Sequence, residues 1–280
     1  MIVRVPGSSA NLGPGFDALG MAVSLEVEMG VLDGAPPVGA VPISPEHPGT
    51  IAFHRAGGRG ALWERSSLPV GRGLGFSGAV RVGGALLAVA QQTDNDLDQV
   101  VARRGEVLAL TSELEGHADN VAASLYGGVV ATAAGRVVQV PLAIDPAIVV
   151  WIPSFVTKTD ESRRALPAEV PLADVVFNIG RVSLLLAALA AGDIAALRDG
   201  TADRLHQDRR LELARPSRAA IDAALDAGAW CSWLSGSGPT VAAMCSLHDG
   251  ERIAASLPAD GVSMVLRIDH GGARLEVPYP

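Results

Sequence analysis

The sequence predicts an α+β fold in two units, and three observations support this prediction. Segments that alternate like strands interleave with segments of helical spacing in a βαββαβ-like order. The chain has 280 residues, 49% of them hydrophobic, which is enough to bury the core of one large or two modest domains. A proline-bounded connection over residues 141–146 is the best candidate for a boundary. We therefore expect an N-terminal domain over residues 1–145 and a C-terminal domain over residues 146–280.

The N-terminal half begins with a strand over residues 2–5, which Pro6 should close because proline lacks the N–H that a strand ladder uses. A polar, glycine-broken loop over residues 7–20 follows, and apolar residues then alternate along a second strand over residues 22–31. The other elements expected here are a Pro/Gly-rich connection over 34–48, a short helix over 50–58, a strand over 61–65, helices over 77–91 and 97–114, a helical turn over 121–125, and a hairpin of strands over 129–133 and 136–140.

The C-terminal half opens with a strand over residues 147–152, and a long apolar helix follows over residues 171–191. The other elements expected here are helices over 194–198, 216–227 and 250–257, and strands over 230–234, 240–245, 263–268 and 273–277. This order of strands and helices is typical of a ferredoxin-like sandwich.

Charge and hydropathy argue against nucleic acid and membranes as partners. The formal net charge is −8, and no basic run is interleaved with aromatic residues. No uninterrupted apolar stretch reaches membrane-spanning length, and the strand-like start shows no signal peptide. We therefore expect a cytoplasmic protein. Lys158 is the only lysine, so any clamp on an anion must use arginine or backbone amides.

The two cysteines, Cys231 and Cys245, flank the turn-like segment SGSGP. If those flanks form a hairpin, the two side chains could lie nearly opposite each other. We expect a reduced, buried pair and no metal site at these residues.

A glycine-rich stretch over residues 69–79, PVGRGLGFSGA, leads into the helix expected over 77–91. Glycines let a ligand approach the main chain, and the start of a helix presents unpaired N–H groups to an anion. The stretch is neither a Walker loop nor a GxGxxG fingerprint after a strand. By itself it therefore fits an ordinary turn before a core helix at least as well as a phosphate site.

Three further polar or glycine-broken stretches change that balance, at residues 8–17, 115–120 and 235–240. With the glycine-rich stretch, they resemble the motifs of the GHMP kinase superfamily and, within it, the homoserine kinase family. The resemblance rests on VPGSSANLGPGFDALGMAV, PVGRGLGFSGA, LEGHADNVAASLYGG and SGSGPT, and it extends from about Val3 to the C-terminal strands.

The resemblance implies an ATP- and Mg²⁺-dependent enzyme that phosphorylates the side-chain hydroxyl of L-homoserine to O-phospho-L-homoserine, on the path to threonine. It also implies an N-terminal domain like the second domain of ribosomal protein S5, a ferredoxin-like C-terminal domain and a homodimer. Two alternatives remain, namely a GHMP kinase for another small alcohol and a catalytically weak relative that binds nucleotide or amino acid.

The motif matches imply roles for individual residues. Ser77 and Glu115 match the family's Mg²⁺ partners, and oxygen ligands suit that ion. The positions that would hold ATP are Pro69, Gly71, Arg72, Gly73, Leu74, Gly75, Phe76, Ser77 and Gly78.

The acceptor end of the site is implied by the other motifs. Asn11, Asp119 and Asn120 match residues beside the reacting hydroxyl, although it stays open whether Asp119 is a general base. Those that would bind L-homoserine are Asp17, His117, Asp119, Arg163 and Arg210. The two arginines suit a carboxylate, which a guanidinium binds with two parallel hydrogen bonds. Without the resemblance, these residues could equally have ordinary structural roles, in turns, in helix caps or as solvated surface charges.

The chain departs from the family pattern at several positions. Phe76 replaces the first loop serine, Gly78 replaces an alanine, and Ala118 stands where proline is usual. Residues 208–209 replace Pro-Tyr, and residues 50–52 lack the asparagine usual near the adenine. We expect these changes to affect rate and nucleotide affinity more than the identity of the reaction.

Overall fold

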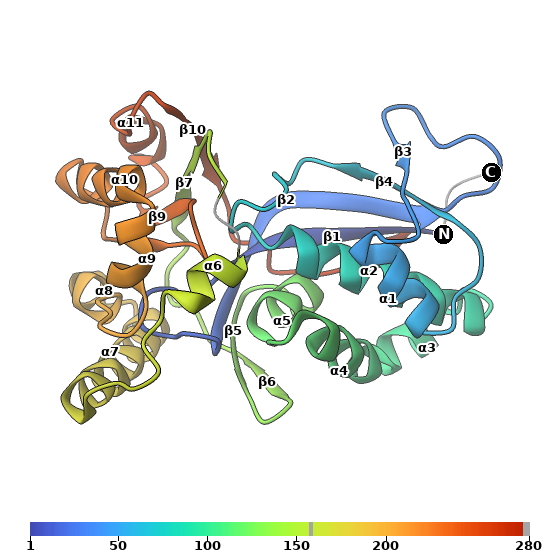
Figure 1. Cartoon of the computed structure of the whole chain (residues 1–280), viewed down its shortest axis with the longest axis horizontal. Helices are drawn as coiled ribbons and strands as arrows, with labels where there is room; N and C mark the ends of the chain where they lie inside the picture. The colour runs from blue at the N-terminus through green and yellow to red at the C-terminus, as the bar shows by residue number, and fades with distance from the viewer. Residues whose placement is uncertain (157–158, 277–280) are drawn as a thin grey trace.

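The computed structural model describes residues 1–156 and 159–276, and within them the predicted α+β class is confirmed. Lys158 and the end of the strand expected over 273–277 lie outside the described residues. Two sheets lie side by side, each with helices packed against it (Figure 1).

The first sheet is antiparallel and is built mainly from the N-terminal half. Its main path has the strand order β11-β1-β2-β4-β3, in which β1 and β2 are the long strands, and β5 pairs with both β2 and β6. The strands are β1 (Ile2–Ala10), β2 (Leu19–Val31), β3 (Val41–Pro42), β4 (Leu62–Ser66), β5 (Val129–Ala133), β6 (Arg136–Gln139) and β11 (Arg274–Glu276). Among the described strands, those before the predicted boundary at residues 145/146 form the first sheet and those after it form the second. The exception is β11, which follows the boundary but pairs with β1 in the first sheet.

The expectation that Pro6 closes the first strand is wrong. β1 continues to Ala10, and its register against β2 shifts between Pro6 and Gly7. A bulge is one of the places where a strand tolerates proline. The continuation carries the chain directly into the loop around Asn11.

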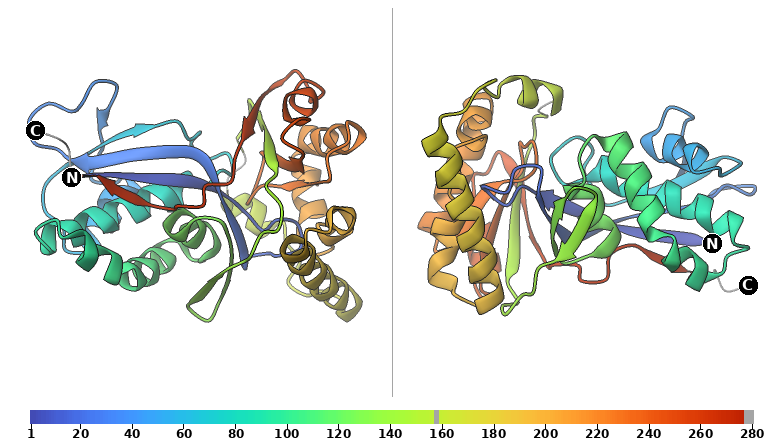
Figure 2. Two further views of the ribbon diagram at one scale, coloured as in Figure 1. Left: turned by 180° about the vertical axis from the view of Figure 1, so that it is seen from behind. Right: turned by 90° about the horizontal axis from the view of Figure 1, so that it is seen from below.

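Helices cover one face of the first sheet (Figure 2). They are α1 (Pro48–Arg55), α2 (Phe76–Gln92), α3 (Leu97–Ala102), α4 (Arg104–Glu115) and α5 (Asp119–Tyr126). The single helix expected over 97–114 is wrong, because the chain forms α3 and α4 with a break at Arg103. The N–H of Arg103 is shared between the carbonyls of Gln99 and Val100, so the helix tightens and ends there.

The second sheet has the order β10-β7-β9-β8 and is also antiparallel. Its strands are β7 (Ala147–Pro153), β8 (Cys231–Leu234), β9 (Val241–Cys245) and β10 (Gly261–Leu266). The helices of this half are α6 (Thr159–Arg164), α7 (Leu172–Ala191), α8 (Ile194–Gly200), α9 (Gln207–Leu213), α10 (Arg215–Asp226) and α11 (Gly250–Ala254). The sequence patterns did not indicate α6, α9 or β3.

Alternation along β7 explains how the second sheet joins two cores. Ile148 and Val150 face the large core shared with the first sheet, whereas Val149 and Trp151 face a smaller core under α10 and α11. The shared core fixes the two sheets against each other, and the pocket described below lies where they meet.

Both cysteines are free and buried, as predicted, but they do not face each other. Cys231 is opposite Met244 and Cys245 is opposite Ala147, so the two side chains enter different cores. Burial raises the pKa of the Cys231 thiol to about 12 and that of Cys245 to about 11.

Helix α7 is long and mostly apolar, but Asp174, Asn178 and Arg181 interrupt it, so it does not contradict the expectation that no uninterrupted apolar stretch reaches membrane-spanning length. By length and composition this helix could cross a membrane, with a mean hydropathy of 1.8. Its Asn178 is buried, donates to Asp203 Oδ1 over 2.7 Å and accepts from the Arg204 N–H over 2.9 Å. These bonds tie α7 to the segment that leads into α9.

Candidate active site

A pocket of about 470 Å³ opens between the two sheets. It collects most of the residues that the motifs predicted, although they come from segments far apart in the sequence. Those lining it are Asn11, Asp17, Gly71, Arg72, Gly73, Gly75, Phe76, Ser77, Glu115, His117, Asp119, Asn120, Arg163 and Arg210. Pro69, Leu74 and Gly78 lie in the same loop and helix but do not line the pocket.

The glycine-rich loop needs its glycines for both conformation and space. Gly71, Gly73 and Gly75 have φ values of 68°, 80° and 69°, which other residues rarely adopt. A Cβ on Gly73 would lie 2.4 Å from the Ser235 carbonyl oxygen, and one on Gly75 would lie 2.1 Å from Ser8 Oγ. The loop is therefore packed between β1 and the SGSGPT turn.

Helix α2 begins directly after this loop, and Gly75 caps it without a side-chain hydrogen bond. Within the described residues, the N–H groups of the first turn are therefore left for another partner. With the dipole of this long helix behind them, they form a site suited to phosphate.

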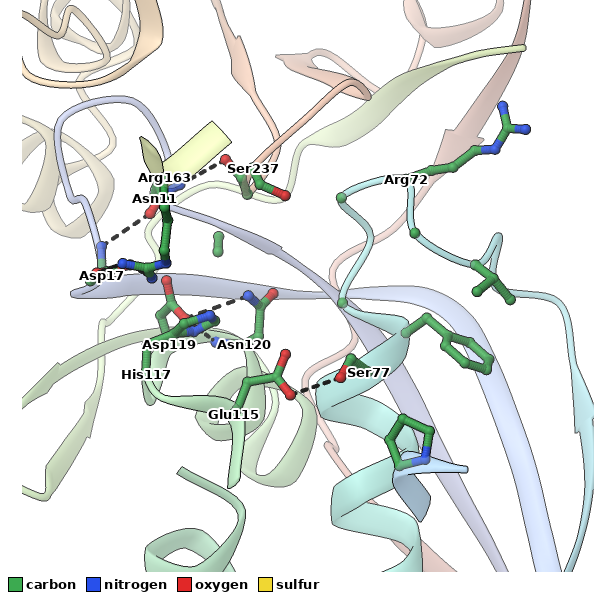
Figure 3. A pocket seen from close by; sticks show the side chains of 18 of the residues that line it. Asn11, Asp17, Arg72, Ser77, Glu115, His117, Asp119, Asn120, Arg163 and Ser237 are labelled. Carbon is green, nitrogen blue, oxygen red and sulfur yellow. Dashed lines mark hydrogen bonds and ion pairs between the residues drawn. The ribbon is translucent and has the colours of Figure 1, made fainter. Parts of the chain in front are cut away.

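Ser77 and Glu115 meet in the middle of the pocket (Figure 3). Ser77 Oγ donates to Glu115 Oε2 over 2.8 Å, and Arg81 Nε donates to the same oxygen over 2.7 Å. Sequence reasoning missed Arg81, which lies one helical turn after Ser77. That i, i+4 spacing on α2 was the signal that could have identified it.

Arg72 belongs to the glycine-rich loop but points away from the other polar side chains (Figure 3). Its Nη1 donates to the carbonyl oxygen of Pro153, at the end of β7. This arginine therefore links the loop to the second sheet.

The loop between β1 and β2 brings Asn11 and Asp17 together. Both have left-handed backbone conformations, with φ values of 70° and 54°, and the Asp17 N–H donates to Asn11 Oδ1 over 3.1 Å. The guanidinium of Arg163 binds the Asp17 carboxylate with two bonds, of 2.8 and 3.0 Å. Arg163 is therefore already paired in this structure.

His117, Asp119 and Asn120 lie beside Asp17 (Figure 3). His117 Nδ1 lies 2.8 Å from Asp119 Oδ1, and the backbone N–H of Asn120 donates to the same oxygen over 2.7 Å. Ser8 Oγ donates to Asn120 Oδ1 over 2.8 Å, so the amide nitrogen of Asn120 is directed elsewhere. Sequence reasoning missed this role of Ser8.

Asp119 and its neighbours also set the charge of His117. Burial pulls the pKa of His117 down, but the hydrogen bond to Asp119 and the charges of Asp119, Glu115 and Asp17 raise it above the ordinary value overall.

Arg210 is the most deeply buried cation that lines the pocket, at 3% exposed. Its Nη1 donates to the Gly236 carbonyl oxygen over 3.1 Å, whereas its buried Nε has no hydrogen-bond partner among the described residues. Burial and the nearby charge of Arg163 lower its pKa to about 10. A buried donor without a partner is costly, and an anion in the pocket would satisfy it.

The opposite end of the pocket, around Phe76, includes three residues that the motifs did not predict, namely His47, Glu64 and Val70. The ring of Phe76 stands edge-on to His47, with centroids 5.9 Å apart, and Val70 and Glu64 lie nearby in the lining. Burial raises the pKa of Glu64. Its buried Oε2 lies 3.5 Å from His47 Nε2 but makes no hydrogen bond within the part of the chain that the structure describes. The signal that could have identified Glu64 as a site residue was a charged side chain within a half-buried strand.

Two sets of side chains among the described residues could hold a cation. Asp17, His117 and Asp119 offer ligand atoms within 4.8 Å of one another, but Arg163 and His117 already compensate those carboxylates. Ser77 and Glu115 offer two oxygens 2.8 Å apart, close to the roughly 2.9 Å between neighbouring ligands of an octahedral Mg²⁺. Arg81 also pairs with Glu115, so neither set lacks a cationic partner. The second set suits Mg²⁺ better because both of its donors are oxygens, which this hard cation prefers over a histidine nitrogen.

Comparison with known proteins identifies both halves of the chain. The GHMP kinases N terminal domain matches residues 51–128, and the family described as GHMP kinases C terminal matches residues 185–263. These matches confirm the predicted two-part fold.

Individual relatives are similar over nearly the whole chain. A homoserine kinase from Moorella thermoacetica is 39% identical over 95% of each chain. One from Thermus thermophilus is 36% identical over 95% of this chain and 96% of its own. The crystal structure of a homoserine kinase from Cytophaga hutchinsonii superposes with a TM-score of 0.83, at 27% identity, over 98% of this chain and 96% of its own.

Proposed function

This chain belongs to the homoserine kinase family of the GHMP kinases, and we propose that it transfers the terminal phosphate of ATP to the side-chain hydroxyl of L-homoserine. The product is O-phospho-L-homoserine. The observation that carries the proposal is the division of the pocket into two unlike ends. One end has a glycine-rich loop at a helix N-terminus, and the other has a carboxylate and a buried, incompletely bonded guanidinium.

The acceptor end matches a free amino acid. The unpaired Nε of Arg210 supports binding of the substrate carboxylate, and the carboxylate of Asp17 supports binding of the ammonium group. Arg163 holds Asp17 in place through its two hydrogen bonds. A neutral alcohol would leave the buried Nε of Arg210 without a hydrogen-bond partner among the described residues.

The loop end matches a triphosphate. We assign the unpaired N–H groups of the first turn of α2, and the glycine-rich loop before it, to the phosphates of ATP. The apolar wall of Val70 and Phe76 would cover the nucleoside. A Mg²⁺ ion held by Ser77 and Glu115 would neutralise the charge that develops during transfer.

The transfer forms a bond from the acceptor oxygen to the terminal phosphorus and breaks the bond from that phosphorus to the oxygen it shares with ADP. The acceptor hydroxyl gives up its proton in the same step, to an oxygen of the transferred phosphoryl group. Catalysis is mainly a matter of position and charge. We assign Asn120 to steady the acceptor oxygen, because Ser8 holds the amide oxygen of Asn120. Asp119 holds His117 and the Asn120 backbone beside the hydroxyl, and Asn11 holds the loop of Asp17.

Identification of the product tests this proposal. The purified protein is incubated with ATP, Mg²⁺ and L-homoserine, and the products are resolved by ³¹P NMR. We expect ADP and a phosphomonoester on the side-chain oxygen. Release of inorganic phosphate without a phosphomonoester would contradict the proposal and favour the catalytically weak relative, an alternative that none of the comparisons supports.

We also propose that the enzyme is a cytoplasmic homodimer that pairs through α7. The exposed side of this helix carries Leu172, Val176 and Ile179, which are 77%, 60% and 62% exposed, and such an apolar stripe is typical of an interface. The substitutions Val176→Glu and Ile179→Glu together should give a monomer in light scattering. Val38→Glu, a matched change at a residue that is 94% exposed in the connection before β3, should leave the dimer intact.

A further inference from the structure

His206 is completely buried just before α9, where the second sheet's helices meet the loop between β1 and β2. Its Nε2 lies 2.7 Å from the carbonyl oxygen of Gly13, and its Nδ1 lies 3.3 Å from Nη1 of Arg210. The imidazole therefore contacts both the Asp17 loop and the guanidinium assigned to the substrate carboxylate.

These two partners determine which ring nitrogen carries the proton. A carbonyl oxygen only accepts hydrogen bonds, so Nε2 of His206 must be protonated to bind Gly13. A guanidinium only donates, so Nδ1 must be unprotonated to bind Arg210. Only the neutral ring with its proton on Nε2 makes both bonds.

The charges around the ring agree with a neutral imidazole. Asp203, whose Oδ2 lies 3.8 Å from Nε2, favours the charged form of His206, as does Asp17, whereas Arg210 opposes it. Burial is the largest influence, and overall the pKa of His206 lies below its ordinary value. Asp203 is itself satisfied by hydrogen bonds from Asn178 and from the backbone at the start of α9.

Phe16 adds a second connection between the Asp17 loop and Arg210. Its ring centroid lies 5.1 Å from that of His206, and the guanidinium carbon of Arg210 lies 5.0 Å from the Phe16 centroid. Phe16 directly precedes Asp17 in the sequence. The position of the Asp17 loop and the position of Arg210 are therefore coupled through the contacts of Phe16 and His206.

We propose that His206 is a positioning residue that sets the distance and orientation between Arg210 and the Asp17 loop. By holding Nη1 from one side while Gly236 holds it from the other, His206 leaves Nε of Arg210 as the donor for the substrate carboxylate. This inference rests on the proposed function, because it assigns a substrate to that donor. His206 does not itself line the pocket, and it acts on the substrate through Arg210, which does.

Two substitutions separate the two ring nitrogens. In His206→Asn the side-chain oxygen can occupy the place of Nδ1 and still accept from Arg210. In His206→Gln the amide nitrogen can reach the place of Nε2 and still donate to Gly13, but the acceptor for Arg210 is lost. We expect His206→Gln to raise KM for L-homoserine at least tenfold, with kcat and KM for ATP changed less than about threefold.

His206→Asn should keep KM for L-homoserine within about threefold of the unchanged enzyme. Equal rises in both variants, or a parallel rise in KM for ATP, would assign His206 a merely structural role and overturn the proposal. An unchanged KM in His206→Gln would overturn it as well.

The tautomer can also be measured without any substitution, which covers the case that a variant does not fold. In the ¹⁵N spectrum of the unchanged protein at neutral pH, His206 should show a protonated Nε2 and an unprotonated, hydrogen-bonded Nδ1. A protonated Nδ1 would overturn the proposal. Turnover of L-homoserine by the unchanged protein is measured first, since its absence refutes the proposed function whereas the spectrum reports on His206 alone.

Discussion

Ser77 Oγ donates a 2.8 Å hydrogen bond to Glu115 Oε2, and this bond joins the first turn of α2 to the last residue of α4. Arg81 binds the same oxygen, so the carboxylate is held between a hydroxyl and a guanidinium. The side chains of Arg81 and Glu115 are 17% and 13% exposed. The two side chains of the proposed metal site are thus held in place by hydrogen bonds between two helices, α2 and α4.

Replacement of Glu115 tests this site. Glu115→Gln removes the negative charge but keeps the size of the side chain, so kcat/KM should fall on the order of a hundredfold or more. The Mg²⁺ concentration needed for half-maximal activity should rise. Both are read from steady-state rates across a Mg²⁺ titration.

Glu113→Gln is the matched control, because Glu113 lies on the same helix, is 68% exposed and pairs only with Arg55 among the described residues. It should change neither quantity. Equal behaviour of the two variants would mean that Glu115 is not a metal ligand.

Arg210→Lys should weaken L-homoserine binding more than Arg163→Lys. Lysine keeps the charge of Arg210 but loses the planar fork and the buried Nε donor, and a charge-assisted hydrogen bond is worth about 1.5–3 kcal/mol. KM for L-homoserine should therefore rise roughly 10- to 100-fold with kcat nearly unchanged. Arg163 is 38% exposed and already bonded to Asp17, so its replacement should cost less.

Arg209→Lys serves as the control for that series because Arg209 is exposed on α9 beside Arg210. If KM for ATP rises in Arg210→Lys while L-homoserine binding is unaffected, the carboxylate has been assigned to the wrong arginine.

Phe76→Ser should affect stability more than catalysis. The Phe76 ring is only 9% exposed and belongs to the main core, so its removal should lower the free energy of unfolding by about 3–5 kcal/mol. The loop binds through backbone N–H groups, so kcat/KM should change less than about tenfold, or ~1.4 kcal/mol of barrier. Urea denaturation and steady-state kinetics measure the two effects, and a gain in activity of several orders of magnitude would instead identify the native chain as a degraded kinase.

His117 should contribute to stability in a pH-dependent way. Its pKa in the folded protein is raised, so the folded state holds the proton more tightly than the unfolded chain. The contribution is fully present below the unfolded pKa of about 6.5 and is lost as pH rises through the higher folded value. The difference in Tm between the unchanged protein and His117→Gln should therefore shrink from pH 5.5 to pH 8.5, and a difference that grew over this range would contradict the pairing with Asp119.

The sequence was sufficient to predict the fold class and most elements, because their apolar periodicity is strong. It did not reveal α9, whose segment is rich in charge, although that helix carries Arg210. It also placed one helix where α3 and α4 meet at Arg103, since apolar spacing does not report a local change of backbone geometry.

Most of the site residues that the motifs predicted line one pocket in the structure. The motifs did not reveal the partners that orient these residues. Ser8, Arg81 and His206 act through contacts with residues far away in the sequence or on another turn of helix. Such partners depend on tertiary packing, and local patterns do not encode it.

The most direct test of the account is a comparison of acceptors in a coupled assay of ADP release. Initial rates are measured with ATP and Mg²⁺ against L-homoserine, L-serine, mevalonate and galactose. We predict that kcat/KM is highest for L-homoserine, because the acceptor end binds both charges of an amino acid and the hydroxyl must reach across to the loop. We also predict that turnover disappears without Mg²⁺, because the ion neutralises the charge that develops during transfer. Turnover of mevalonate without turnover of L-homoserine would contradict the account.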